Sequence, residues 1–129
     1  MNALSAHASI TMMLNEFFAG YEASRPIFEA LREAIEELGP SEIRVTKSQV
    51  AFYRRKAFAW AWMPDPYLHS NHAPLVLTLS FRYRDPSPRW KEIVEPKPGR
   101  FTHHLQLYSP ADIDDEVRDW LRAAWEAAA

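Results

Sequence analysis

Five histidines are the residues of this chain best suited to acid–base or metal chemistry. His69 and His72 form an H-x-x-H pair in a proline-rich stretch that also contains Asp65. Imidazole and carboxylate groups bind zinc, but a zinc site needs three or four convergent ligands. The pair is therefore a weak metal candidate beside the interpretation that both are ordinary exposed loop residues. We expect no bound metal and no cofactor.

His103 and His104 are neighbours in a segment with strand periodicity. Successive side chains of a strand point to opposite faces of the sheet, so the two cannot chelate one ion together. The alternation of apolar residues predicts that His103 is a hydrogen-bonded core residue and that His104 lies on the open face. His104 is thus the candidate acid or base if the protein is an enzyme.

Nucleophilic chemistry has little support in the sequence. The chain has no cysteine and only three glycines, so it has neither a thiol nucleophile nor a glycine-rich phosphate loop. Ser80 could lie beside His104 on a neighbouring strand, but no acid is placed to orient the imidazole. A solvated sheet surface explains the two residues as well, and the sequence favours a protein that is not an enzyme.

Positive charge is concentrated in the middle of the chain. Between Arg44 and Arg100 there are 11 Lys or Arg and 4 Asp or Glu, a net charge of +7, whereas the two flanks hold 4 positive and 13 negative residues, a net charge of −9. Such an asymmetry favours an anionic ligand or association between copies of the chain.

The open face of the predicted sheet gathers polar, basic and aromatic residues. The alanines Ala57, Ala59 and Ala61 alternate with Phe58, Trp60 and Trp62, so if the alanines pack against helices, the aromatic residues share this open face. Exposed tryptophans cost about 25 cal/mol per Å² of apolar surface, so loops, a second subunit or a ligand should cover them. The candidate ligand-binding residues are Lys47, Trp60, Trp62, Arg82, Arg84, Trp90 and His104, with Thr78, Ser80, Thr102, Gln106 and Tyr108 beside them.

The leading functional hypothesis is a non-catalytic binding or interaction module whose basic, aromatic sheet face takes an anionic ligand. Two alternatives stay open: a small enzyme that uses His104 as acid or base and Arg82 or Arg84 to hold an anionic substrate, and a module that associates with nucleic acid. An ordinary solvated sheet face, with acidic helices balancing a basic sheet, is the further interpretation. A homodimer is compatible with all of them.

Helical periodicity marks both ends of the chain. Apolar residues at helical spacing predict a helix over residues 10–21, with Ser9 as N-cap and Gly20 as stop. A second helix is predicted to begin at Ser24-Arg25-Pro26 and to end at Gly39-Pro40. The last helix is predicted to begin near Ser109 or Asp112.

Between the helices the periodicity changes to two. Strands are predicted over residues 43–53, 57–62, 75–84 and 100–108, with a turn at Arg54-Arg55-Lys56. Ser87-Pro88 resembles the start of a short helix carrying Trp90, Ile93 and Val94.

The order α-α-β-β-β-(short α)-β-α predicts a two-layer α+β fold, in which N- and C-terminal helices cover one face of an antiparallel sheet of about four strands. The 129 residues suit one domain, with residues 1–8 poorly ordered or partly helical. No signal peptide or membrane span is evident, and with no cysteine the composition suits the cytoplasm.

Several segments together resemble a known family. The strongest is Ser109 to Leu121 (SPADIDDEVRDWL), and Gly99 to His104 (GRFTHH), Arg25 to Ala30 (RPIFEA), Leu38-Gly39-Pro40 and the strand pair from Val50 to Phe58 add to it. Over residues 10–125 the chain is similar to small, mostly actinobacterial proteins of the domain-of-unknown-function 5655 family. Some relatives carry a zinc ribbon of paired cysteines, which this chain lacks. The resemblance implies the architecture and no activity.

Overall fold

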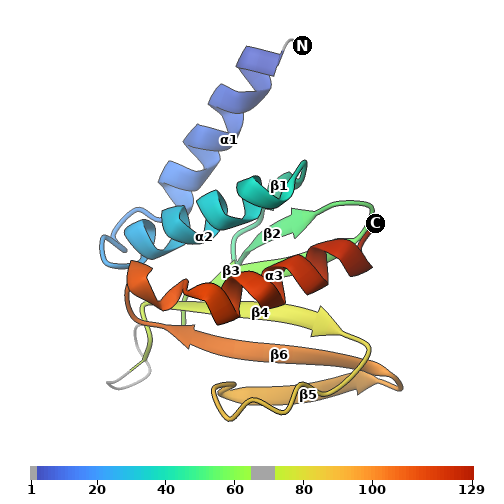
Figure 1. The fold of residues 1–129 in the computed structure, drawn as a ribbon. Coiled ribbons are helices and arrows are strands. Elements are labelled where there is room, and N and C mark those ends of the chain that lie inside the picture. Colours follow the sequence, from blue (N-terminus) through green and yellow to red (C-terminus); the bar gives the residue numbers. More distant parts are fainter. Residues whose placement is uncertain (1–2, 65–71) are drawn as a thin grey trace.

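In the part of the chain that the structure describes, six strands and three α-helices make up the fold (Figure 1). The structure is a computed structural model, and it describes residues 3–64 and 72–129, with side chains from residue 9 onward. The elements are α1 (Ala3–Phe17), α2 (Ser24–Leu38), β1 (Glu42–Val45), β2 (Val50–Tyr53), β3 (Ala57–Trp62), β4 (Leu75–Phe81), β5 (Glu92–Lys97), β6 (Arg100–Leu107), a 3-10 turn η1 (Pro110–Asp112) and α3 (Asp115–Ala127). No described helix has the length and apolarity needed to cross a lipid bilayer.

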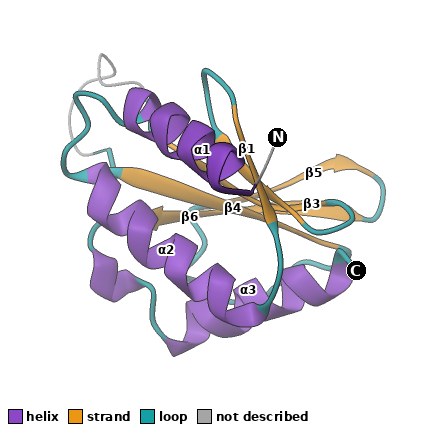
Figure 2. Ribbon diagram, turned by 90° about the horizontal axis from the view of Figure 1, so that it is seen from above, coloured by secondary structure: helices purple, strands orange, loops and turns teal. Residues whose placement is uncertain are grey.

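All neighbouring strands pair antiparallel, in the order β1-β2-β3-β4-β6-β5. Helices α2 and α3 lie together on one face of this sheet, as the view from above shows (Figure 2). The predicted α+β class with an antiparallel sheet is confirmed, and the sheet has six strands rather than about four. Helix α1 contacts the edge strand β1 and leads away from the body of the fold (Figure 1).

The core lies between α2, α3 and the sheet, and the apolar residues of β4 and β6 border it. Leu77, Leu79 and Leu107 are fully buried, as are Phe28 of α2 and Leu121 of α3. This burial follows from the period-two pattern, since apolar residues recur at every second position of β4 and dominate one face of β6.

Two predicted elements are wrong. Residues 43–53 form two strands and not one, because Thr46 Oγ1 accepts hydrogen bonds from the amides of Ser48 and Gln49 and closes a turn between β1 and β2. Residues 92–97 form β5 and not part of a short helix. The Ser87-Pro88 signal produces only a local turn, in which Ser87 Oγ accepts from the amide of Arg89, and the β-branched residues that follow pair with β6.

Helix ends also differ in detail from the predictions. Helix α1 begins at Ala3, well before the predicted N-cap Ser9. Ser24 opens α2, but its hydroxyl donates to the carbonyl of Pro74 instead of capping the helix. Strand β4 ends at Phe81, so residues 82–84 lie beyond the sheet ladder.

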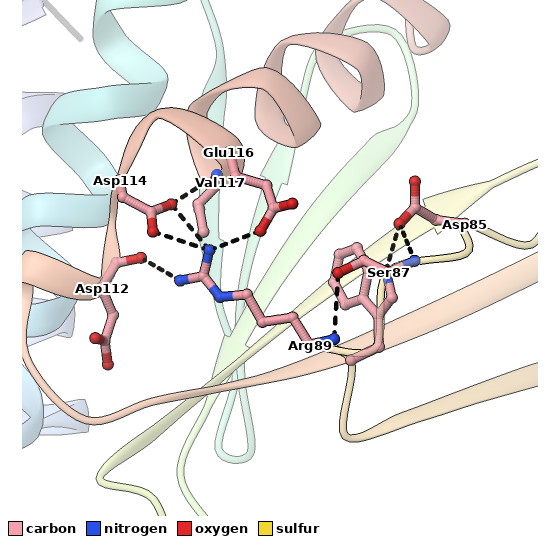
Figure 3. Close-up of polar contacts among 8 residues, drawn as sticks. Asp85, Ser87, Arg89, Asp112, Asp114, Glu116 and Val117 are labelled. Carbon is pink, nitrogen blue, oxygen red and sulfur yellow. Dashed lines mark hydrogen bonds and ion pairs between the residues drawn. The ribbon is translucent and has the colours of Figure 1, made fainter.

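The loop between β4 and β5 is held against the start of α3 by Arg89 (Figure 3). Its guanidinium lies 2.9 Å from Asp114 Oδ2 and 3.0 Å from Glu116 Oε1, and it donates to the carbonyl of Asp112 at 3.1 Å. Asp114 also caps α3 by accepting from the amide of Val117. Burial would raise the pKa of Asp114, but these donors stabilise the carboxylate and the pKa is lowered.

Gly39, which follows α2, is a site where a methyl group should be costly. Its φ is +146°, and a Cβ there would lie 2.6 Å from Cζ2 of Trp125. We expect Gly39→Ala to lower the free energy of unfolding by about 2 kcal/mol, because the strained backbone and the overlap add. Urea unfolding measures this change.

Gly99→Ala is the matched control for Gly39→Ala. Gly99 also has a positive φ, +77°, but nothing lies within 4 Å of its Cβ position. Its backbone strain alone should cost about 1 kcal/mol. Equal losses of unfolding free energy in the two variants would show that the indole of Trp125 moves away from the added methyl group at no cost in stability.

Candidate functional site

A groove crosses the face of the sheet opposite α2 and α3. Its cavity volume is about 450 Å³, and its lining residues are Ser48, Gln49, Trp60, Trp62, Thr78, Thr102 and His104. The register places Trp60 opposite Thr78, Thr78 opposite His104, and His104 opposite Glu92. Since residues directly opposite in an antiparallel pair share a face, β3, β4, β6 and β5 form one continuous row of side chains.

The alanines of β3 explain why both tryptophans face this groove. Ala59 and Ala61 are fully buried in the core on the helix side, which leaves Trp60 and Trp62 on the opposite face. The pairing shifts between Phe52 and Tyr53, which are opposite Ala59 and Ala57, so that Phe58 is an extra residue. A bulge of this kind breaks the alternation.

The side chain of Phe58 therefore departs from the strict alternation predicted for β3. The sequence placed it with the tryptophans, but its ring lies in the core with a centroid 6.4 Å from that of Phe52. The bulge moves one aromatic ring from the groove to the core and leaves the groove with two.

A chain of hydrogen bonds at the groove floor links Trp62, Thr78 and His104. Trp62 Nε1 donates to Thr78 Oγ1 at 2.9 Å, and Thr78 Oγ1 lies 2.7 Å from His104 Nδ1. Because the indole N–H can only donate, the hydroxyl accepts from Trp62, and its own proton can be donated to Nδ1. With this direction His104 is a neutral imidazole that carries its proton on Nε2 and offers an N–H donor there; with the reverse direction the proton is on Nδ1.

Burial reinforces the neutral form of His104. The imidazole is partly buried beside Trp62, with ring centroids 6.0 Å apart and ring planes perpendicular. Desolvation lowers the pKa of His104, although the nearby carboxylate of Glu92 opposes the shift. The groove therefore presents two indoles and a neutral imidazole at neutral pH.

His103 points the other way and is fully buried. Its Nδ1 donates to the carbonyl of Phe101 at 3.1 Å, and its Nε2 accepts from the amide of Asp85 at 3.0 Å. Both ring nitrogens are occupied, and desolvation lowers the pKa of His103 as well. The predicted separation of the two histidines into a core residue and a groove residue is confirmed.

The structure brings together Trp60, Trp62 and His104 of the predicted ligand-binding residues. Arg82 lies in a different cavity, and Arg84 stacks on the ring of Phe101 with its Cζ 5.5 Å from the centroid. Both lie past the end of β4, where alternation no longer predicts direction. Lys47 is exposed in the β1–β2 turn, next to Ser48 of the groove wall, and lines a depression beside α1.

The structure corrects the prediction that Trp90 is one of the ligand-binding residues. It does not line the groove, because it is buried on the helix side, where its ring centroid lies 4.1 Å from that of Trp120. Its Nε1 donates to Asp85 Oδ2 at 2.9 Å. The path of the loop after β4 crosses to the helix layer, which strand periodicity cannot show.

Ser48 and Glu92 belong to the groove region, but the sequence pattern does not predict them there. Ser48 falls within the segment predicted as one continuous strand, although the polar run Thr46-Lys47-Ser48 is typical of a turn. Glu92 was placed in a helix, and only the pairing of β5 with β6 puts it opposite His104.

The H-x-x-H metal candidate can be followed only in part. Asp65 and His69 lie outside the described residues, and His72 is exposed. In the described ranges, no three His, Cys, Asp or Glu side chains come together in a group that could hold a metal ion.

Comparison with family models gives a match over residues 14–128 to a family described as Domain of unknown function (DUF5655). No curated protein and no solved structure matches the chain significantly. The family description assigns no activity, so the groove chemistry is the guide to function. The match runs from the end of α1 through α3 and includes every strand, and the chain therefore belongs to the DUF5655 family.

Proposed function

We propose that the protein is a non-catalytic binding module whose groove takes a small, flat heteroaromatic ligand that carries an anionic oxygen. The observation that carries the proposal is the Trp62–Thr78–His104 hydrogen-bond chain on the open sheet face. In the proposed site the Thr78 hydroxyl donates to Nδ1, which leaves a neutral imidazole with its N–H on Nε2 beside two partly exposed indoles.

The two indoles account for the ring in the proposed ligand. Trp60 and Trp62 are two residues apart on one strand, so their side chains are about 7 Å apart along the groove. Aromatic side chains each bury about 150–250 Å² and stack on flat rings with about 1–3 kcal/mol per base when the ring is a nucleobase. A heteroaromatic ring between them would cover apolar surface that is otherwise in water.

The donor at His104 and the surrounding charge account for the anionic oxygen. Nε2–H of His104 is an N–H donor, which selects an acceptor on the ligand. Lys47 is next in sequence to the groove wall, and the +7 charge of residues 44–100 makes the potential of this part of the chain positive. Arg82 and Arg84 are not needed for this ligand, since they do not line the groove.

Titration of tryptophan fluorescence with nucleoside monophosphates, each beside its uncharged nucleoside, tests the proposal. We expect the nucleotides to quench fluorescence saturably, and Trp60→Ala to weaken binding about tenfold because one stacking surface is lost. Trp125→Phe is the matched control, since Trp125 lies on α3 away from the groove and its replacement should leave affinity unchanged. Equal effects of the two replacements, or no response to any nucleotide, would contradict the proposal.

Thr78→Val tests the hydrogen-bond chain independently of any ligand. In the unmodified protein, imidazole ¹H–¹⁵N spectra should show His104 protonated on Nε2 and not on Nδ1. Valine keeps the shape of threonine but removes the proton given to Nδ1, so the variant should show a mixture of tautomers and weaker nucleotide binding. An Nδ1–H tautomer in the unmodified protein would remove the basis of the proposal.

The same experiments separate the other hypotheses. Preference for oligonucleotides over nucleotides would indicate a nucleic-acid module. Conversion of a nucleotide that stops in His104→Gln would indicate an enzyme. A dimer in sedimentation that dissociates in Trp60→Ala would show that a second copy covers the groove.

A further inference from the structure

A second cavity, of about 250 Å³, opens where β3 and β4 separate. The pairing of these strands ends at Ala59 and Leu79, so Ala57 and Phe58 diverge from the residues that follow β4. The end of α3 closes the gap. The cavity shares no lining residue with the sheet-face groove, and its lining residues are Lys56, Ala57, Phe58, Ser80, Phe81, Arg82, Tyr83, Arg100, Ala123, Ala124, Ala127 and Ala128.

Three cations from three separate elements converge on this cavity. Lys56 comes from the β2–β3 turn, Arg82 from the residues after β4, and Arg100 from the first position of β6. Within the described part of the chain none of them forms an ion pair, and the lining contains no Asp or Glu. A bound anion would be attracted by three positive side chains that have no counter-ion in the lining.

The neighbouring arginines show that this charge is not simply the means by which α3 is held. Arg54 donates to the carbonyl of Trp125 at 3.2 Å, with its guanidinium 3.5 Å from the Trp125 ring centroid, and the amide of Arg55 donates to the carbonyl of Ala128. These contacts satisfy carbonyls at the end of α3, where the helix dipole is negative. Lys56, the third residue of the same turn, lines the cavity instead.

The remainder of the lining is apolar and small. The methyl groups of Ala123, Ala124 and Ala127 form one wall, and Phe58 and Phe81 add ring surface. Small side chains leave a space that larger ones would fill, and the space is adjacent to the three cations. The cavity therefore combines an apolar interior with a positive rim.

We propose that this cavity binds a small organic anion, with its carboxylate or phosphate group at Lys56, Arg82 and Arg100 and a short aliphatic tail against the alanines of α3. Arginine recognises both oxyanions through paired N–H donors, so both share this chemistry. The site is separate from the groove and does not depend on the function proposed for it.

Amide chemical shifts of the ¹⁵N-labelled protein, titrated in phosphate-free buffer, test the proposal. The probes are hexanoate and butyl phosphate, with hexanol as the uncharged match and inorganic phosphate as the anion without a tail. We expect both organic anions to shift the amides of Ala123, Ala127 and Arg82 saturably, and to bind about tenfold more tightly than either match. Whichever of hexanoate and butyl phosphate binds more tightly shows whether the site prefers a carboxylate or a phosphate group.

Two variants and one control variant locate the binding. The double variant Arg82→Gln, Arg100→Gln should weaken hexanoate about tenfold, whereas Lys91→Gln, Arg122→Gln removes the same charge outside the lining and should change affinity less than about twofold. Ala127→Leu, at an exposed position, should fill the cavity and weaken hexanoate while all three cations remain. Equal weakening by both double variants, hexanol binding as tightly as hexanoate, or no saturable shift would overturn the proposal.

Discussion

We expect Trp90→Ala to lower the free energy of unfolding by about 3–5 kcal/mol, the range for removal of a large aromatic side chain from a core. Trp90 is 8% exposed, and its ring centroid lies 4.1 Å from that of Trp120 and 4.9 Å from that of His103. The replacement also leaves Asp85 Oδ2 without the indole donor that now lies at 2.9 Å. Loss of packing and loss of a hydrogen bond to a carboxylate therefore act together.

Trp60→Ala is the control for this prediction. It removes the same side chain from the open face, where the indole is partly exposed and has no helix packed on it. Less apolar surface returns to water, so it should cost clearly less than Trp90→Ala. Urea unfolding of both variants at one pH measures the difference. Trp90→Ala costing no more than Trp60→Ala would show that the cluster under α3 is not part of the stabilising core.

We also expect the protein to lose stability as the pH falls below about 6.5, the ordinary pKa of histidine. Burial lowers the folded-state pKa of both His103 and His104. The unfolded chain therefore binds these protons first. The stability that the two histidines contribute is complete above the unfolded pKa and is lost as the pH falls through the folded values, with a limiting slope of about 1.4 kcal/mol per pH unit for each proton.

The hydrogen bonds of His103 give this prediction its structural reason. A proton on Nε2 would face the amide N–H of Asp85, and the carbonyl of Phe101 already accepts from Nδ1. The carboxylate of Asp85 favours protonation and Arg84 opposes it, but desolvation is the largest effect. The folded protein must therefore rearrange this loop before His103 can take up a proton.

Urea unfolding across the range from pH 5 to about pH 7.5 measures the effect for the unmodified protein and for His103→Gln. The variant should be less stable at neutral pH but should depend less on pH, because one of the two protons is no longer taken up. His72→Gln, at an exposed position, is the control and should follow the unmodified protein. An unchanged slope in His103→Gln would mean that His103 binds its proton equally in the folded and the unfolded chain.

Local patterns predicted much of the fold correctly. The 3.6-residue spacing of Ile27, Leu31 and Ile35 predicted α2, and all three side chains are buried. The alternation in β4 and β6 predicted which side chains face the helices, and it separated His103 from His104. These features depend on which side chains leave water on folding, and the order of apolar and polar residues along the chain already indicates which side chains those are.

The candidate site was predicted less completely. Trp60, Trp62 and His104 share the groove as expected, because Ala59 and Ala61, which alternate with the tryptophans, pack against the helices. Trp90 and Arg82 lie elsewhere, because both belong to the connection from β4 to β5, whose path follows from distant contacts. The stacking of Trp90 on Trp120 and the ion pairs of Arg89 with the start of α3 determine that path.

By itself, then, the amino-acid sequence determined the class of fold, the buried face of each long element and the strand residues that meet water, since each depends on the periodicity of apolar residues within a few turns or alternations. The tertiary structure alone decided the pairing of β5 with β6, the bulge that turns Phe58 into the core, and the meeting of Lys56, Arg82 and Arg100 at one cavity. These features depend on contacts between residues far apart in the chain, and no local pattern encodes which distant partner will be close enough to make them.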